Sequence, residues 1–151
     1  MGRITRLMLG LSVVISVPLM AALTQTQADA EALVKQAVAF GKANGTYKLI
    51  KEVNSPETQF KKGSLYIFIL DMEGVMLGHA ANPKLVGSDM GERKDADNVR
   101  YIQEFIKMAE TKGSGWVDYK FVNPETNKVE DKTSFIEKVN TVIIGCGVYK
   151  K

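Results

Sequence analysis

One lysine within a predicted strand is the residue best suited to hold a ligand. Lys132 lies in the strand-like stretch Val129–Lys138, and its ammonium group is a compact cation that can pair with a carboxylate. The alternative is a solvated lysine at a sheet edge, surrounded by acids, which are Glu130, Asp131 and Glu137. Residue types alone leave both interpretations open, because lysines are mostly exposed unless they are paired.

Two further polar residues could bind the same ligand. Tyr119 alternates with Val117 and Phe121, so the three side chains share one face of a strand. Its apolar ring and hydrogen-bonding tip fit either a pocket wall or a core position bonded to the backbone. His79 is the only histidine. It could donate to a carboxylate and make binding depend on pH, or it could fix the loop that follows it.

Aromatic residues elsewhere in the chain could complete such a pocket. Tyr66 and Phe68 share one face of the apolar stretch Leu65–Asp71, so they line either the pocket or the core. Tyr101 lies on a predicted helix that should cover the sheet, and Arg100 beside it is more simply a solvated helix charge. The candidate ligand-binding residues are therefore Tyr119, Lys132, His79, Tyr66, Phe68, Phe121 and Tyr101.

The composition leaves little from which to build a catalytic or metal site. The chain has one histidine, one cysteine and no GxSxG nucleophile motif, and a CxxCH haem site needs a second cysteine. The acids between Asp89 and Asp97 do not match the spacing of an EF-hand calcium loop. Cys146 lies in the most apolar predicted strand, where a thiol packs as a small hydrophobe. We therefore predict no catalytic residue, no metal, no cofactor and no enzyme activity.

The first 28 residues have the order of a secretory signal peptide. Two arginines precede the apolar run Leu7–Leu23, and small residues follow it, with cleavage predicted after Ala28 or Ala30. The alternative is that this segment remains as an N-terminal membrane anchor. Cleavage after Ala28 lowers the formal net charge from +3 to +1, which leaves no basic patch for nucleic acid. We expect a periplasmic or secreted protein with a single domain over residues 29–151.

The order of the predicted elements favours an α+β fold. Helical spacing of apolar residues predicts helices over Asp29–Asn44, Thr46–Val53 and Ala96–Thr111. Runs of β-branched and aromatic residues predict strands over Leu65–Asp71, Val75–Ala80, Trp116–Val122, Val129–Lys138 and Thr141–Tyr149. Because the strands come in runs instead of alternating with helices, their sheet should be antiparallel.

Two glycines, Gly145 and Gly147, occupy alternate positions of the last predicted strand. Glycine within a strand lets another backbone or a ligand come close to the sheet. We expect these two glycines to receive a packed helix, the segment Ala30–Ala37, and the alternative is a bound ligand.

Three segments occur in an order and at a spacing that resemble those of a known family. They are LYIFILDMEGVMLGHAANPKLVGSDM, GSGWVDYKFVNPETNKVEDKTSF and IIGCGVYK. Together they resemble the single Cache domains of type 2, which are PAS-like extracytoplasmic sensor modules, from about Asp29 to Tyr149. The resemblance implies a five-stranded antiparallel sheet with a long N-terminal helix on one face. It also implies a ligand pocket on the other face, covered by the helix and loop between the second and third strands.

The same resemblance implies a function in signal transduction. Members usually form the outer, sensing part of chemoreceptors and histidine kinases, and short secreted members also exist. Their ligands are small organic molecules, often short carboxylates. We therefore expect a stand-alone sensor or binding protein for a short organic acid, with a membrane receptor or sensor kinase as its partner. The alternative is an interaction domain that forms a homodimer through its N-terminal helix without a ligand.

Two positions depart from the family pattern. Asp131 stands where the family commonly has proline, and Phe135 stands where it commonly has tyrosine. If that tyrosine touches the ligand, the missing hydroxyl removes a hydrogen-bond donor. The identity or the affinity of the ligand would then differ in this chain.

Overall fold

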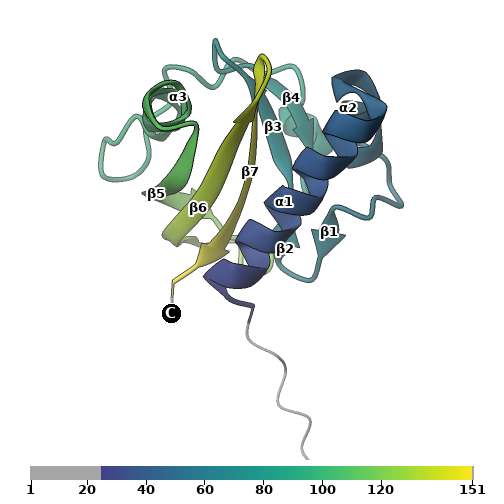
Figure 1. Cartoon of the computed structure of the whole chain (residues 1–151). Coiled ribbons are helices and arrows are strands. Elements are labelled where there is room, and N and C mark those ends of the chain that lie inside the picture. Colours follow the sequence, from purple (N-terminus) through teal and green to yellow (C-terminus); the bar gives the residue numbers. More distant parts are fainter. Residues whose placement is uncertain (1–24, 151) are drawn as a thin grey trace, which may run out of the picture.

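Helix α1, Gln27–Asn44, lies across one face of a twisted sheet (Figure 1). The computed structural model describes residues 25–150. The helix begins at a capping box, in which Thr26 Oγ1 accepts from the Asp29 N–H at 3.2 Å and the Asp29 carboxylate accepts from the Thr26 N–H at 2.7 Å. It therefore starts two residues before the predicted position and ends as predicted. Helix α2, Thr46–Val53, has its predicted bounds.

Five strands form one antiparallel sheet in the order β4-β3-β7-β6-β5. Their bounds are β3 Phe68–Asp71, β4 Met76–His79, β5 Ser114–Val122, β6 Val129–Val139 and β7 Val142–Tyr149. A short hairpin of β1 Lys61–Lys62 and β2 Leu65–Tyr66 precedes them. The predicted first strand is thus divided at Ile67, whose N–H bonds to the Phe60 carbonyl outside the sheet. The α+β prediction with a five-stranded antiparallel sheet is confirmed.

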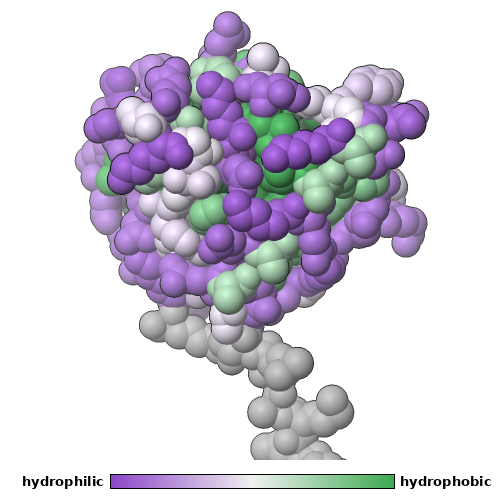
Figure 2. Space-filling view, in the orientation of Figure 1, coloured by the Kyte–Doolittle hydropathy of each residue, from purple (hydrophilic) through white to green (hydrophobic). Residues whose placement is uncertain are grey.

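Alternating side chains give the sheet a separate hydrophobic core on each face. Leu65, Ile67 and Ile69 pack into the core beneath α1 and α2. The intervening residues Tyr66, Phe68 and Leu70 pack into the core on the α3 side. The predicted alternation is confirmed on this stretch, and also on β7, where Ile144 and Cys146 join the α1 core. The face of the molecule that carries α1 is mainly hydrophilic, with a small hydrophobic area near its centre (Figure 2).

The second face is covered by the connection between β4 and β5, which contains the 3-10 helix η1, Pro83–Leu85, and helix α3, Tyr101–Thr111. Helix α3 starts at Tyr101, five residues after the predicted start at Ala96. Asp95 Oδ1 accepts from the N–H groups two and four residues further on, at 2.9 and 2.8 Å. Asn98 has a φ of 63°, which is outside the right-handed helical region. These residues therefore form a turn in place of the predicted first helical turn.

Gly145 and Gly147 face the α3 side of the sheet, so the expectation that they receive the N-terminal helix is wrong. A Cβ at Gly145 would overlap the ring of Phe68, and a Cβ at Gly147 would overlap Ser134 Oγ and lie 2.8 Å from Lys132 Cε. The two glycines therefore make room for side chains of the neighbouring strands. Among residues 25–150, no helix combines the length and the hydropathy that crossing a bilayer requires.

Candidate ligand-binding site

Three polar side chains lie in one row across the α3 face of the sheet. The strand register places Tyr119 of β5 opposite Lys132 of β6, and Lys132 opposite Tyr149 of β7. Directly opposed residues of antiparallel strands point to the same face. In the next row Ser134 lies opposite Gly147, and the Tyr119 hydroxyl is 2.9 Å from Ser134 Oγ. Tyr119 and Lys132, which were predicted separately as ligand-binding residues, therefore share one face of the sheet.

Lys132 is a buried cation whose neighbours are aromatic. Its residue is 1% exposed, and Nζ lies 2.5 Å from the Tyr66 hydroxyl and 3.4 Å from the Tyr149 hydroxyl. The ring centroids of Tyr66, Tyr149 and Phe121 are 4.3, 4.7 and 5.3 Å from Nζ. Within the described chain Lys132 forms no ion pair. The solvated-edge interpretation is therefore wrong, because the neighbouring strands enclose this lysine.

Burial lowers the pKa of Lys132 from 10.5 to about 7. Taking an ammonium group out of water costs free energy unless an anion or a hydrogen-bond network offsets it. Cation–π contacts and phenol oxygens offset part of that cost. A carboxylate beside Nζ would supply the missing opposite charge and would raise the lysine pKa.

His79 is a neutral imidazole that holds the start of the covering connection. Its Nδ1 accepts from the N–H groups of Ala81 at 3.3 Å and Asn82 at 2.9 Å. Burial, and then the charge of Lys132, lower its pKa to about 4. Because Nδ1 is an acceptor, the neutral ring carries its proton on Nε2. The loop-fixing role considered from the sequence is thus present, and the Nε2–H group is a donor for a second partner.

Stacked aromatic rings close the site from the α3 side. The ring of Tyr101 lies 4.8 Å from that of Tyr119, with an interplanar angle of 9°. Phe105 stacks on Phe68 at 5.6 Å, and Tyr101 meets Phe121 edge-on at 6.1 Å. The prediction that Tyr101 reaches inward from the covering helix therefore agrees with the structure. Its neighbour Arg100 pairs with Glu92 at the surface, at 3.0 Å.

All seven predicted residues line one cavity between the sheet and its cover. The other lining residues are Met76, Met90, Ile102 and Phe105. The space that the centre of a water molecule can occupy is about 20 Å³, which corresponds to about one water. The structure therefore brings the predicted residues together around one small space. Their role in binding stays a prediction.

Sequence reasoning missed several residues around this cavity. Tyr149 contacts Lys132 through its hydroxyl, and that hydroxyl also donates to the Val122 carbonyl at 2.9 Å. The GxGxY sequence at the chain end was a usable signal for Tyr149, because alternation puts it on the glycine face. No local signal marked Met76 or Met90, since their positions depend on how the connection folds back onto the sheet.

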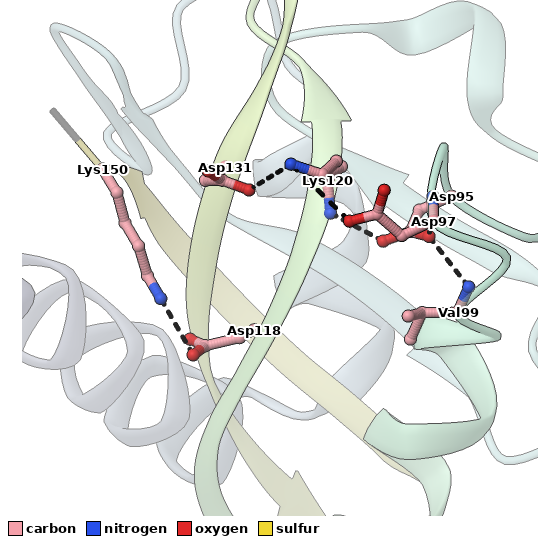
Figure 3. Close-up of polar contacts among 7 residues, drawn as sticks. All are labelled: Asp95, Asp97, Val99, Asp118, Lys120, Asp131 and Lys150. Atoms are coloured by element: carbon pink, nitrogen blue, oxygen red, sulfur yellow. Dashed lines mark hydrogen bonds and ion pairs between the residues drawn. The ribbon is translucent and has the colours of Figure 1, made fainter.

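The outer side of the β5–β6 pair carries a cluster of ion pairs (Figure 3). Lys120 Nζ lies 2.7 Å from Asp131 and 3.6 Å from Asp97, and Lys150 Nζ lies 2.8 Å from Asp118. Asp131, the position where the family commonly has proline, therefore pairs with Lys120 and contributes no side chain to the cavity around Lys132. These charges are largely exposed, so each pair contributes little to stability.

Asp95 connects the covering segment to the edge of the sheet. Its Oδ2 accepts from the backbone N–H of Lys120 at 2.9 Å (Figure 3), while its Oδ1 holds the turn before α3. Burial is the largest single influence on the pKa of Asp95 and raises it, but the backbone hydrogen bonds together outweigh burial, so the pKa lies below its usual value. Within residues 25–150, no three His, Cys, Asp or Glu side chains come together as metal ligands would.

Phe135, the second departure from the family pattern, lies on the face opposite the cavity. Its ring packs 5.4 Å from that of Trp116, and Lys35 Nζ lies 5.3 Å from its centroid. A tyrosine hydroxyl at this position would therefore point away from Lys132. Its absence does not remove a donor from the cavity.

Comparisons with known proteins agree with this architecture. The sequence model described as Cache domain matches residues 24–151. The methyl-accepting chemotaxis protein McpP of Pseudomonas putida is 35% identical over 86 residues, which are 56% of this chain and 16% of McpP. The sensor histidine kinase MctS of Rhizobium johnstonii is 30% identical over 86 residues, which are 56% of this chain and 18% of MctS. The aligned part is thus less than a fifth of either relative.

A solved Cache chemosensory domain, studied for its recognition of carboxylic acids, has a similar fold. The TM-score is 0.64 at 26% identity, and the match covers 80% of this chain and 86% of that one. By its sequence and its fold, the chain belongs to the Cache domain family.

Proposed function

We propose that the chain is an extracytoplasmic sensor domain that binds a short organic acid in the cavity around Lys132. The observation that carries this proposal is a buried ammonium group with aromatic neighbours and no anionic partner among the described residues. A ligand carboxylate would offset the desolvation of that charge. The similarity to chemoreceptors, a sensor kinase and a carboxylic-acid-binding domain supports the same conclusion.

The groups around the cavity suit a carboxylate with a small apolar remainder. Lys132 Nζ would donate to one carboxylate oxygen, and His79 Nε2–H is a further donor beside it. The rings of Phe68 and Phe105 form an apolar wall for the carbon atoms. Such a mixture of few polar groups and many apolar ones is typical of small-molecule pockets.

Ligand binding would move the cover, because the cavity now has room for about one water. Tyr101 and Phe105 of α3 close the cavity, and the connection before α3 is attached to β5 through Asp95. A ligand that binds the more open form better shifts the population toward it. A displacement of α3 relative to the sheet is therefore our proposed signal for a membrane receptor or sensor kinase.

The location of the protein is part of the same proposal. We infer that residues 1–28 act as a signal peptide, although most of that segment lies outside the described residues. Cleavage after Ala28 would remove Thr26, whose side chain caps α1, and cleavage after Ala30 would remove a fully buried residue. Mass spectrometry of the exported protein measures the first residue. An intact N-terminus in the membrane fraction would instead support an anchor.

A thermal-shift screen with acetate, propionate, lactate and pyruvate tests the binding proposal. At least one acid should raise the melting temperature, and Lys132→Met should abolish that rise while the variant stays folded. Lys138→Met is the matched control, since Lys138 is an exposed lysine on the same strand. If no acid stabilises the protein and light scattering shows a dimer, the ligand-free interaction domain becomes the better interpretation.

A further inference from the structure

An open groove of about 400 Å³ adjoins the cavity around Lys132. Tyr66, His79 and Phe121 line both spaces, so the two adjoin at these side chains. The remaining residues of the groove come from the β4–β5 connection and from the β5–β6 hairpin. They are Ala81, Asn82, Leu85, Arg93, Val122, Pro124 and Asn127. The groove is therefore a solvent-exposed space directly beside the cavity.

Arg93 is the charged residue that lines this groove, and no acid lines it. Its guanidinium makes no ion pair or side-chain hydrogen bond with another described residue, whereas its neighbour Glu92 pairs with Arg100. The charge of Arg93 also acts on Tyr101, a residue that lines the cavity. Burial raises the pKa of Tyr101, and the positive charge of Arg93 lowers it by a smaller amount. An arginine in this position can bind a carboxylate with two parallel hydrogen bonds.

The relative sizes of the two spaces determine what kind of ligand uses both. Before the cover moves, the cavity has room for about one water, and once opened it suits one end of a molecule, whereas the groove is already far larger. We propose that the groove is a second subsite, in which Arg93 holds the far carboxylate of a short dicarboxylate whose first carboxylate pairs with Lys132. This inference rests on the proposed function of the Lys132 cavity. It extends the ligand class from one acidic group to two.

The carbon chain of such a ligand would pass between the side chains that the two spaces share. Tyr66 and Phe121 offer apolar surfaces for methylene groups, and His79 Nε2–H can donate to a carboxylate. Leu85 and Val122 would also accept an alkyl tail in the groove. The decisive comparison is therefore between acids of equal length that differ only in the second carboxylate.

Isothermal titration calorimetry at pH 7 makes this comparison with glutarate against pentanoate, and with succinate against butyrate. We expect each dicarboxylate to bind about fivefold more tightly than its matched monocarboxylate, the upper range for a partly exposed ion pair. Arg93→Gln should remove that difference and leave the affinity for the monocarboxylates unchanged within about twofold. Lys94→Gln is the matched control, since Lys94 is exposed, adjacent and outside the groove.

The outcomes separate this inference from the proposed function. If monocarboxylates bind in a Lys132-dependent manner but dicarboxylates bind no better, the second subsite is refuted and the sensor proposal stands. If Arg93→Gln weakened the binding of monocarboxylates and dicarboxylates equally, the second subsite would also be refuted. That result would show a long-range electrostatic effect of Arg93 and no specific contact with the second carboxylate. If neither acid type binds, the proposed function itself fails.

Discussion

The charge state of Lys132 makes ligand affinity depend on pH in a way that the structure specifies. In the free protein burial lowers the pKa of Lys132 to about 7, so the ammonium form becomes scarce as the pH rises above neutral. A bound carboxylate stabilises the ammonium form and raises that pKa. Binding above pH 7 should therefore take up a proton, and affinity should fall as the pH rises.

The size of the change in affinity with pH follows from the fraction of protein in which Lys132 is charged and can bind the acid. With a pKa of about 7, roughly nine-tenths of Lys132 is charged at pH 6 and about 1% at pH 9. The apparent dissociation constant is the intrinsic constant divided by that fraction. It should therefore increase about 100-fold between pH 6 and pH 9, and proton uptake should approach one per ligand at the upper end.

Other groups in the cavity do not titrate in this range. The pKa of His79 is lowered to about 4, and the pKa values of Tyr66 and Tyr119 are raised well above 10 by burial. The pKa values of Tyr101 and Tyr149 are raised as well. Short carboxylic acids are already ionised at pH 6. The change in affinity is therefore assigned to Lys132.

Calorimetry of one bound acid, in two buffers of different ionisation enthalpy at each pH, measures both the dissociation constant and the number of protons taken up per ligand. Lys132→Met should weaken binding by 10-fold or more at pH 6, since it removes a charged hydrogen-bond donor worth about 1.5–3 kcal/mol. Its residual binding should not vary with pH. An affinity that stays constant from pH 6 to pH 9, or binding without proton uptake at pH 8, would refute the argument that a buried, uncompensated lysine carries the site.

Three further predictions concern the protein without ligand. Its free energy of unfolding should rise by about 2 kcal/mol from pH 7 to pH 9, because the unfolded chain keeps the Lys132 proton up to pH 10.5 and the folded chain releases it near 7. Urea titrations of Lys132→Met should lack this rise. Gly147→Ala should destabilise the fold by about 1–3 kcal/mol through overpacking against Ser134 Oγ, the Thr133 carbonyl and Lys132 Cε, and equal urea midpoints would contradict it. Asp95→Ala should speed amide hydrogen exchange at Val99 and Lys120 at least tenfold, since it removes the acceptor of both N–H groups; unchanged exchange would show that other contacts hold the turn.

Most of the fold could be predicted from local sequence patterns. The prediction was wrong where contacts between residues far apart in the sequence determine the structure. Alternation on Leu65–Asp71 correctly assigned each side chain to its face. The hairpin strand β1 was missed, because two exposed lysines carry no apolar pattern. Helix α3 starts late because Asp95 bonds to the turn and to β5. A hydrogen bond from a strand that lies 25 residues away is not visible in the local sequence.

The polar residues at the centre of the candidate site, Tyr119 and Lys132, could be predicted from the sequence. Their burial and the residues around them could not. Alternation placed Tyr119 on one strand face, and the family resemblance indicated Lys132. The burial of Lys132 was not predictable from composition, because its sequence neighbours are acids and lysines are usually exposed. Arg93 was also missed. Its relevance depends on how the connection runs beside the β5–β6 hairpin, which no periodicity encodes.

The glycine at position 147 also constrains the order in which this site could change during evolution. Adding any side chain there while Lys132 is present forces an overlap with Ser134 and crowds the lysine stem. Ser134 Oγ and the Thr133 carbonyl are nearer to this position than the lysine stem, and both contacts would remain if Lys132 were lost. A side chain at position 147 therefore requires changes at Ser134 and in the backbone of β6 first, whether or not the lysine is kept. Relatives that have lost the cation should thus still carry glycine here.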